Sequence, residues 1–248
     1  MHTKIIIPIF KEYFSENEFF SINYSLKVLI DKDITFIFPN ELNLEYYKKT
    51  FPKINFFSLP KEFFYSQKTY NQLCYERAFY EFFKNDCTHI LILQPDAIVI
   101  NSDILEWSNS RFDYIGGPES NDYSYNITSV MPFTDLPSFH PIRLQGCNGG
   151  LSLRKVESFI KVLEEYEELT KLFRTYAGGI GEDIFFSLMG RVSSFFQVPN
   201  ELIASKFALT DKFQEWIAFN KALPCGFHAW YNTQESEDYI KGLLPKIE

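Results

Sequence analysis

The sequence predicts an α/β protein whose central sheet is mostly parallel and carries helices on both faces. Runs rich in β-branched and apolar residues, at 4–9, 34–38, 54–57 and 89–93, have the length of buried strands. Segments with helical spacing separate them, and this alternation produces a parallel sheet. No repeat, linker or low-complexity tract divides the 248 residues, so a single domain over 1–248 is expected.

Three helices are expected in the first half of the chain. Ser15 and Glu18 form an S-x-x-E capping box before an apolar stripe, which predicts a helix beginning there. A short helix is expected at 42–47 and a longer one over 70–83. The residues predicted to bury the longer helix are Cys74, Ala78, Phe79 and Phe82.

The second half is less regular. A polar, proline-punctuated stretch at 119–145 has no clear period, and loops of this length are usually functional or mobile. The expected elements around it are a strand over 112–115 that ends at glycines, a tight turn at 148–150 before a strand at 151–153, and helices over 155–176 and 184–189.

Composition excludes several classes of protein. The chain has 24 Lys and Arg against 32 Asp and Glu, a net charge of −8, with no basic block. Binding to a phosphate backbone needs clustered basic residues, so no nucleic-acid partner is expected. A hydrophobic content of 46% excludes a disordered chain. The aromatic content of 18% exceeds what a core requires, so some rings are expected to line a concave site.

Cysteine spacing and hydropathy favour a cytoplasmic protein. The four cysteines form no CxxC pair, which is typical of neither a zinc site nor a disulfide framework, so reduced thiols are expected. The first apolar run ends at Pro8, too early for a signal peptide. No apolar run reaches the roughly 18 residues that a membrane span requires.

Asp96 is the first candidate for chemistry because it follows the buried strand at 89–93. Ligands of such sheets bind beyond the carboxyl ends of the strands. A carboxylate there suits Mg²⁺ or Mn²⁺, which prefer oxygen ligands and are commonly held together with substrate phosphates. The alternative is that Asp96 caps the turn after Pro95. No GxGxxG or P-loop motif follows a strand, so a phosphate would need another device.

Three further groups of residues are open to two interpretations. Glu182 and Asp183 either cap a helix or supply a general base that the preceding glycines allow to approach a substrate. The glycines at 148–150 form either a turn or a close approach of backbone to a ligand, with Arg154 a candidate contact to phosphate or to a carboxylate. His228 is either a hydrogen-bonded structural residue or a metal ligand.

Six short segments that carry these residues occur in a specific order. They are YNQLCYERAFYEFF at 70–83, ILILQPDAIV at 90–99, FDYIGGP at 112–118, NGGLSLR at 148–154, GEDIFF at 181–186 and GFHAW at 226–230. In this combination, over roughly residues 4–230, the chain resembles a largely uncharacterised family of glycosyltransferase-like proteins. That family is similar to GT-A type nucleotide-sugar transferases.

The resemblance implies a GT-A, Rossmann-like fold in which about residues 1–100 hold a nucleotide diphosphate sugar and 101–248 receive the acceptor. It implies an inverting, hexosyltransferase-like enzyme in which Asp183, beside Glu182, is the base. The donor site that it implies consists of Pro8, Phe10, Tyr70, Gln94, Asp96, Asn148, Gly149, Gly150 and Arg154.

The resemblance also implies a divalent cation, Mn²⁺ or Mg²⁺, held by Asp96 and His228. GT-A enzymes typically have a DxD at this point, whereas Gln94 occupies the first position here, which puts strict metal dependence in question. A cation is nevertheless expected on electrostatic grounds, because an acidic protein without a P-loop cannot easily hold a pyrophosphate. Rings of Phe10, Tyr70 or Trp230 are candidates for stacking on the nucleobase or sugar.

The resemblance further implies a glycan or lipid-linked glycan acceptor, shaped by residues 119–145, and a place in bacterial surface polysaccharide biosynthesis. Peripheral contact with the inner face of the membrane and the oligomeric state stay open. Two alternative functions also stay open. A non-catalytic carbohydrate or nucleotide-sugar binding module is suggested by the missing first carboxylate, and a phosphoryl or nucleotidyl transferase would use the same metal carboxylate.

Overall fold

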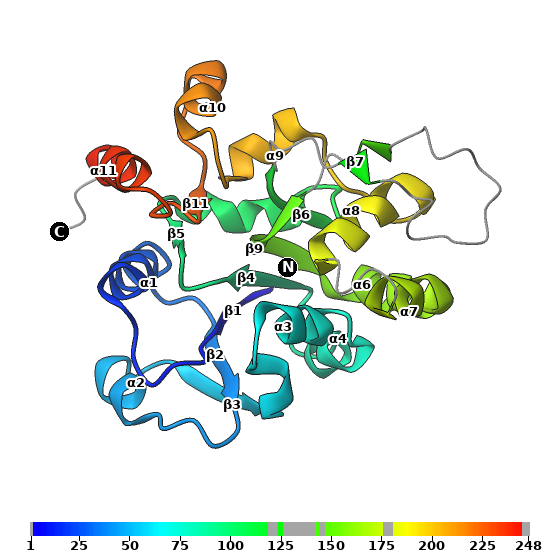
Figure 1. Cartoon of the computed structure of the whole chain (residues 1–248), viewed down its shortest axis with the longest axis horizontal. Coiled ribbons are helices and arrows are strands. Elements are labelled where there is room, and N and C mark those ends of the chain that lie inside the picture. Colours follow the sequence, from blue (N-terminus) through cyan, green and yellow to red (C-terminus); the bar gives the residue numbers. More distant parts are fainter. Residues whose placement is uncertain (1, 119–123, 126–141, 144–146, 176–180, 245–248) are drawn as a thin grey trace.

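The computed structural model describes residues 2–118, 124–125, 142–143, 147–175 and 181–244 (Figure 1). Its central sheet has six strands in the order β3-β2-β1-β4-β9-β6. The strands are β1 (Thr3–Pro8), β2 (Ile34–Pro39), β3 (Asn55–Leu59), β4 (His89–Leu93), β6 (Tyr114–Pro118) and β9 (Cys147–Lys155). The first four are parallel, and β9 runs antiparallel to both of its neighbours. The predicted mostly parallel α/β fold is therefore confirmed.

Helices cover both faces of this sheet (Figure 1). One face packs against α1 (Glu16–Val28), α2 (Glu45–Thr50), the 3₁₀ helix η2 (Ser102–Asn109) and α9 (Glu201–Phe207). The other packs against α3 (Gln67–Cys74), α4 (Arg77–Phe83), α6 (Val156–Glu165), α7 (Glu167–Thr175) and α8 (Glu182–Val192). Along β4, Ile90 and Ile92 face the second group while Leu91 and Leu93 face the first, as the two-residue period of a strand requires.

A second, smaller sheet extends the fold beside α1. It consists of β10 (Ala208–Leu209), β11 (Gly226–His228) and β5 (Ala97–Val99). The remaining elements are a 3₁₀ turn η1 (Lys61–Phe64), α10 (Phe213–Asn220), α11 (Gln234–Leu243) and the paired strands β7 (Ser124–Tyr125) and β8 (Ile142–Arg143). Because β5 directly follows β4, the small sheet brings the C-terminal part of the chain to the carboxyl end of the central sheet.

Local signals placed several elements correctly. The Ser15 side chain caps α1 and the Glu18 side chain reciprocates, so the predicted capping box is confirmed. All four cysteines are buried and free, as expected. Among the described residues, no helix is both long and apolar enough to cross a membrane. Most of the predicted loop at 119–145 lies outside the described residues, as do Gly178 and Gly179.

The prediction of one continuous helix over 70–83 was wrong. The helix starts earlier, at the capping residue Ser66, and breaks at Glu76, whose backbone is extended. The break rotates the second piece, so Phe79 and Phe83 are buried while Phe82 is 54% exposed. Of the predicted stripe, Ala78 is exposed as well. Apolar spacing alone cannot reveal a break that tertiary contacts of Glu76 stabilise.

Three other predictions need similar corrections. The helix predicted over 155–176 is interrupted at Tyr166, which separates α6 from α7. The predicted strand at 112–115 does not end at its glycines, because Gly116 and Gly117 lie inside β6. The turn predicted at 148–150 is part of β9. Glycine usually marks a strand end. Here, however, β6 and β9 pair with each other, and each strand continues across two consecutive glycines.

Candidate active site

A cavity of about 430 Å³ opens at the carboxyl ends of β1 and β4. It brings together six residues that the sequence predicted for the donor and metal sites, namely Pro8, Phe10, Tyr70, Gln94, Asp96 and His228. The other residues that line it are Glu18, Phe64, Tyr65, Ser66, Gln67, Pro95 and Tyr231. Residues separated by more than 200 positions therefore share one site, as the sheet topology requires.

Backbone hydrogen bonds hold Asp96 at the mouth of this cavity. The Ala97 N–H donates to the Gln94 carbonyl at 2.9 Å, which closes a tight turn around Asp96. The Ala229 N–H donates to the Asp96 carbonyl at 3.1 Å, and Ala229 has a φ of 53°. This left-handed residue directly follows His228, whose strand pairs with β5 at Ala97. The turn and the strand pairing together place the two predicted metal ligands side by side.

His228 is nearly buried and lacks the partners that a structural histidine normally has. Its side chain is 11% exposed, yet neither ring nitrogen has a hydrogen-bond partner among the described residues. Its Nε2 lies 3.4 Å from Oδ1 of Asp96. A Cβ on Gly150 would lie 2.1 Å from the same nitrogen, so the imidazole packs directly on glycine backbone. Buried polar atoms without partners are rare and usually have a functional reason.

The electrostatics of the cavity favour a cation. Burial by itself would raise the pKa of the Asp96 carboxyl, but the facing His228 and the nearby Lys11 lower it overall, so Asp96 is ionised. Glu18 also lines the cavity, where it accepts from Lys11 Nζ at 2.8 Å. Among the described residues, none that lines the cavity is a lysine or arginine. The protein alone thus offers this cavity little positive charge for a phosphate.

Asp96 and His228 fit a divalent cation bound with few protein ligands. Adjacent ligands around Mg²⁺ or Mn²⁺, with bonds of about 2.1 Å, are about 3 Å apart, close to the observed 3.4 Å. Within the described part of the chain, no group of three or more His, Cys, Asp or Glu side chains could hold a metal. The donor set suits a cation that takes its other ligands from water and substrate phosphates, as Mg²⁺ commonly does.

The exposed rings at the cavity include one of those expected, Phe10, and one that was not, Tyr65. Phe10 is 50% exposed and Tyr65 is 66% exposed, so both present ring surface at the cavity. Trp230 was a wrong candidate for stacking, because it is fully buried and its Nε1 donates to Ser21 Oγ at 2.9 Å. Its place directly after the motif histidine does not bring it into the cavity, because β11 ends at His228 and the chain turns back into the core.

The glycines of β9 form a bulge beside His228. Gly116 pairs with Ser152 and Pro118 with Cys147, so two steps along β6 correspond to five along β9. The Asn148 side chain closes the bulge by accepting from the Gly150 N–H at 2.8 Å. The bulge is why glycine is needed at 116, where a Cβ would lie 2.0 Å from the Asn148 carbonyl oxygen.

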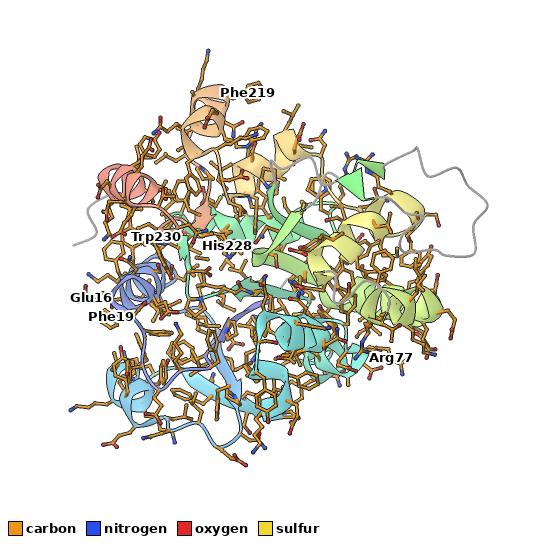
Figure 2. All side chains as sticks on the ribbon, in the orientation of Figure 1. Glu16, Phe19, Arg77, Phe219, His228 and Trp230 are labelled. Carbon is orange, nitrogen blue, oxygen red and sulfur yellow. The ribbon has the colours of Figure 1, made fainter. Side chains whose placement is uncertain are left out.

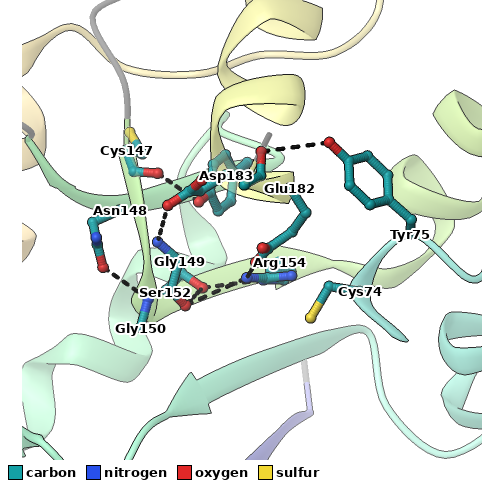
Figure 3. Close-up of polar contacts among 12 residues, drawn as sticks. Cys74, Tyr75, Cys147, Asn148, Gly149, Gly150, Ser152, Arg154, Glu182 and Asp183 are labelled. Carbon is teal, nitrogen blue, oxygen red and sulfur yellow. Dashed lines mark hydrogen bonds and ion pairs between the residues drawn. The ribbon is translucent and has the colours of Figure 1, made fainter. Parts of the chain in front are cut away.

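The same bulge reaches the two carboxylates at the start of α8 (Figure 3). The Gly149 N–H donates to Asp183 Oδ2 at 3.3 Å, and the Asp183 Oδ1 accepts from the Ile184 N–H at 2.8 Å. Asp183 is partly exposed, whereas Glu182 is 4% exposed. The adjacent residues Gly149 and Gly150 therefore connect Asp183 on one side to His228 on the other.

Arg154 and Glu182 lie beneath this surface and do not reach it. Arg154 is fully buried, and its Nη2 donates to Glu182 Oε1 at 2.7 Å. Its other nitrogens donate to Ser152 and Tyr80. The prediction that Arg154 contacts the donor is therefore corrected to its alternative, a contact with a site carboxylate. Glu182 is likewise poorly placed as a base, since its carboxylate neutralises a buried guanidinium.

The sequence prediction missed the segment from Phe64 to Gln67, together with Glu18 and Tyr231. One signal was present, because Ser66 and Thr69 form a reciprocal cap at the start of α3. A helix start at Ser66 would have placed the preceding residues at the edge of the sheet, next to the cavity.

Comparison with known proteins identifies the family. Residues 53–228 match the family described as "Protein of unknown function (DUF5672)". The chain belongs to this family. No curated protein matches the sequence.

Solved structures of glycosyltransferases share the fold of this DUF5672 protein. The galactosyltransferase LgtC, in complex with donor and acceptor sugar analogues, superposes with a TM-score of 0.58 at 14% identity, covering 99% of this chain and 97% of that one. Mouse xyloside xylosyltransferase 1 superposes with a TM-score of 0.60 at 15% identity, covering 94% and 99%. Aspergillus fumigatus core-mannan synthase A, in an Mn/GDP form, gives 0.51 at 13% identity, covering 82% and 72%. The chain therefore has a GT-A glycosyltransferase fold.

Proposed function

We propose that this protein is a metal-assisted glycosyltransferase that moves a sugar from a nucleoside diphosphate sugar to an acceptor hydroxyl. One observation carries the proposal: the nearly buried His228, whose ring nitrogens have no hydrogen-bond partner among the described residues, faces Asp96 in a cavity that no described lysine or arginine lines. This arrangement suits a cation that brings a diphosphate with it. The GT-A fold and the Mn/GDP form of one structural neighbour support the same proposal.

In the proposed donor complex, Asp96 and His228 hold Mn²⁺ or Mg²⁺. When bound, the cation supplies positive charge that binds the diphosphate and stabilises it as the leaving group. The exposed rings of Phe10 and Tyr65 offer stacking surface for the nucleobase. Tyr70, within α3, and Gln94, directly after β4, complete the wall.

The donor sugar is proposed to lie against the bulge at Asn148 to Gly150. The two glycines allow His228 and the Arg154–Glu182 pair to pack directly on this backbone, which places the bulge beside the proposed metal ligand. Asp183 is held at this backbone by the Gly149 N–H. We assign it as the base that removes the proton from the acceptor hydroxyl as the oxygen attacks the anomeric carbon. Direct attack of this kind inverts the anomeric configuration, which NMR of the product would report.

The division of labour proposed for the single domain is that about residues 1–100 bind the nucleotide and 101–248 bind the acceptor. Most of the cavity-lining residues come from the first hundred residues, which supports the first half of this division. A glycan or lipid-linked glycan acceptor, a hexosyl donor, a cytoplasmic location and a role in bacterial surface polysaccharide synthesis are the further proposals. They are supported by the family resemblance.

The experiment that tests the function compares two carboxylates. Asp183→Asn is expected to reduce transfer at least about 1,000-fold while nucleoside diphosphate binding changes little, because the variant keeps the shape but cannot accept a proton. Asp96→Ala is expected to weaken nucleotide binding only in the presence of Mn²⁺. Sugar transfer would be measured with a panel of nucleotide sugars, and binding by calorimetry. Full activity of Asp183→Asn would exclude it as the base.

A non-catalytic binding module is the second candidate, and Gln94 favours it. Gln94 occupies the place of the first DxD carboxylate, which leaves Asp96 as the single acidic ligand of the motif. A binding module would be stabilised by nucleotide sugars with Mn²⁺ without releasing a nucleoside diphosphate. Metal-dependent release of that product would exclude this candidate.

A further inference from the structure

We propose that Arg154 is a positioning residue that holds Asp183 and the β9 bulge in register for transfer, without touching the donor. The inference rests on the proposed function, because it concerns the residue assigned there as the base. It differs from the role that the sequence suggested, which was direct contact between Arg154 and the donor.

The first observation is that every Arg154 nitrogen is engaged inside the protein. Nε donates to Ser152 Oγ at 3.0 Å and Nη1 donates to Tyr80 Oη at 3.0 Å. Nη2 donates to Glu182 Oε1 at 2.7 Å and to the Gly149 carbonyl at 3.3 Å. The guanidinium also lies 5.7 Å from the centroids of two rings, those of Tyr114 and Phe159. A fully buried guanidinium with all three nitrogens engaged has no surface for a phosphate.

The second observation is that two of these contacts lead to Asp183 by separate routes (Figure 3). Through the Gly149 carbonyl, Arg154 fixes the residue whose N–H donates to Asp183 Oδ2. Through Glu182, it fixes the first turn of α8, where Asp183 is the next residue. Ser152 Oγ supports the same arrangement by donating to the Gly149 carbonyl at 2.8 Å.

The third observation is that Arg154 and Glu182 pack tightly against Gly149. A Cβ at Gly149 would lie 2.7 Å from Glu182 Oε1 and 3.0 Å from Arg154 Nη2. The amide of Asn71, with its nitrogen turned toward the carboxylate, donates to Glu182 Oε2 at 3.0 Å and holds Glu182 from its other side. Strand, bulge and helix therefore meet at one guanidinium.

The charges agree with this assignment. Burial raises the pKa of the neighbouring Tyr80 hydroxyl and that of the Cys74 thiol, the latter to about 12, so both groups stay protonated. Glu182 is then the buried carboxylate that balances the charge of Arg154. Asp183, the next residue, accepts hydrogen bonds from the backbone N–H groups of Gly149 and Ile184.

The test is Arg154→Lys, which keeps the charge but loses the planar fork that spans Gly149 and Glu182. We expect kcat to fall about 100-fold, since small misplacement of a catalytic group has effects of this size. The KM for the donor and the Kd for a nucleoside diphosphate with Mn²⁺ are expected to stay within about twofold. The matched control is Arg111→Lys, which changes an exposed arginine and should alter none of these values.

Three outcomes would overturn the proposal. A tenfold or larger increase in the nucleoside diphosphate Kd would show that Arg154 contacts the donor. An unchanged kcat would show that Arg154 only stabilises the fold. Unchanged hydrogen exchange of the Gly149 amide, followed by NMR, would show that its contact with Asp183 does not depend on Arg154.

The exchange measurement also separates this proposal from the proposed function. If the wild-type protein transfers no sugar but Arg154→Lys speeds exchange of the Gly149 amide at least tenfold, the glycosyltransferase assignment fails and the positioning role stands. Should Arg154→Lys not fold, Ser152→Ala replaces it. That variant removes the hydroxyl that supports Arg154 and Gly149 but leaves the pair with Glu182, so a smaller loss of kcat, about fivefold, is expected with an unchanged Kd.

Discussion

Two histidines lie at opposite ends of strand β4, and the fold satisfies one of them but not the other (Figure 2 labels His228). His89 begins the strand, is 3% exposed, and its Nδ1 lies 3.0 Å from Thr88 Oγ1. His228 lies beyond the other end and is nearly buried; in the described part of the chain neither of its nitrogens has a hydrogen-bond partner, and Asp96 lies 3.4 Å away. Burial alone therefore does not mark a functional histidine. What distinguishes the proposed metal ligand His228 is its unmet hydrogen-bonding capacity at the carboxyl end.

The surrounding charges show the same difference between the two ends. At the amino end, Lys4 Nζ lies 3.0 Å from Asp33 and 2.7 Å from Asp86, so the charges are paired within the protein. At the carboxyl end, His228 is the one basic side chain of the described residues within ion-pair distance of Asp96, at 3.4 Å. Groups that are paired contribute to stability, whereas groups left without partners are available to a ligand.

The largest expected difference between the ends is in activity. His228→Ala should reduce transfer on the order of 1,000-fold, because a metal that it helps to hold supplies several kcal/mol of stabilisation to the leaving group. The matched variant His89→Gln should leave the rate unchanged. Donor turnover at saturating Mn²⁺ is the measurement, and equal losses in both variants would contradict the distinction between the two ends.

The second effect is on stability at low pH and belongs to the amino end. Burial, and then the charge of Lys155, lower the pKa of His89 to about 4 from 6.5. Between about pH 6.5 and 4, His89 therefore binds a proton in the unfolded chain but not in the folded protein. The free energy of unfolding falls as the pH drops through this range. The expected loss is about 2–3 kcal/mol by linkage.

Urea unfolding across this pH range would measure the effect. His89→Gln should remove this loss of unfolding free energy at low pH, because glutamine does not titrate. An unchanged pH dependence in that variant would mean that folding does not shift the pKa of His89.

A smaller effect is expected from crowding His228. Gly150→Ala places a Cβ where it would lie 2.1 Å from His228 Nε2, so the imidazole must leave its present position. Mn²⁺-dependent nucleotide binding should weaken roughly tenfold, within the range seen when the support of a metal ligand is lost. Gly242→Ala is the matched control, because nothing lies within 4 Å of a Cβ there. Calorimetry would measure the nucleotide affinity of both variants, and an equal loss in both would contradict a specific effect of crowding His228.

The smallest expected effect tests whether the amino end matters only for stability. Lys4→Met removes the partner of two carboxylates and should reduce the free energy of unfolding by about 1 kcal/mol, since these pairs are partly solvated. Nucleotide affinity and the rate of transfer should not change. A loss of affinity would show that the two ends of the sheet are coupled.

How far the sequence predicted this structure depended on whether the signal was local. The capping box at Ser15 is one local signal, and the apolar run of β4 with the carboxylate that follows it is another. Each consists of residues close together in the chain, and each was placed correctly. The breaks at Glu76 and Tyr166 were missed because an apolar stripe continues across both. The NGG segment was assigned to a turn because a bulge is defined only by the partner strand.

The sequence by itself determined the class of fold and the kinds of side chain available to the site, because strand and helix periods and the residues that follow strands are local properties. Tertiary structure decided the roles. It placed His228 against Asp96 and buried Trp230. It also turned Arg154 inward to Glu182, which left Asp183 at the surface of the bulge. The physical reason is that burial and hydrogen-bond partners depend on segments far apart in the chain, and these decide whether a polar group is satisfied or free to act.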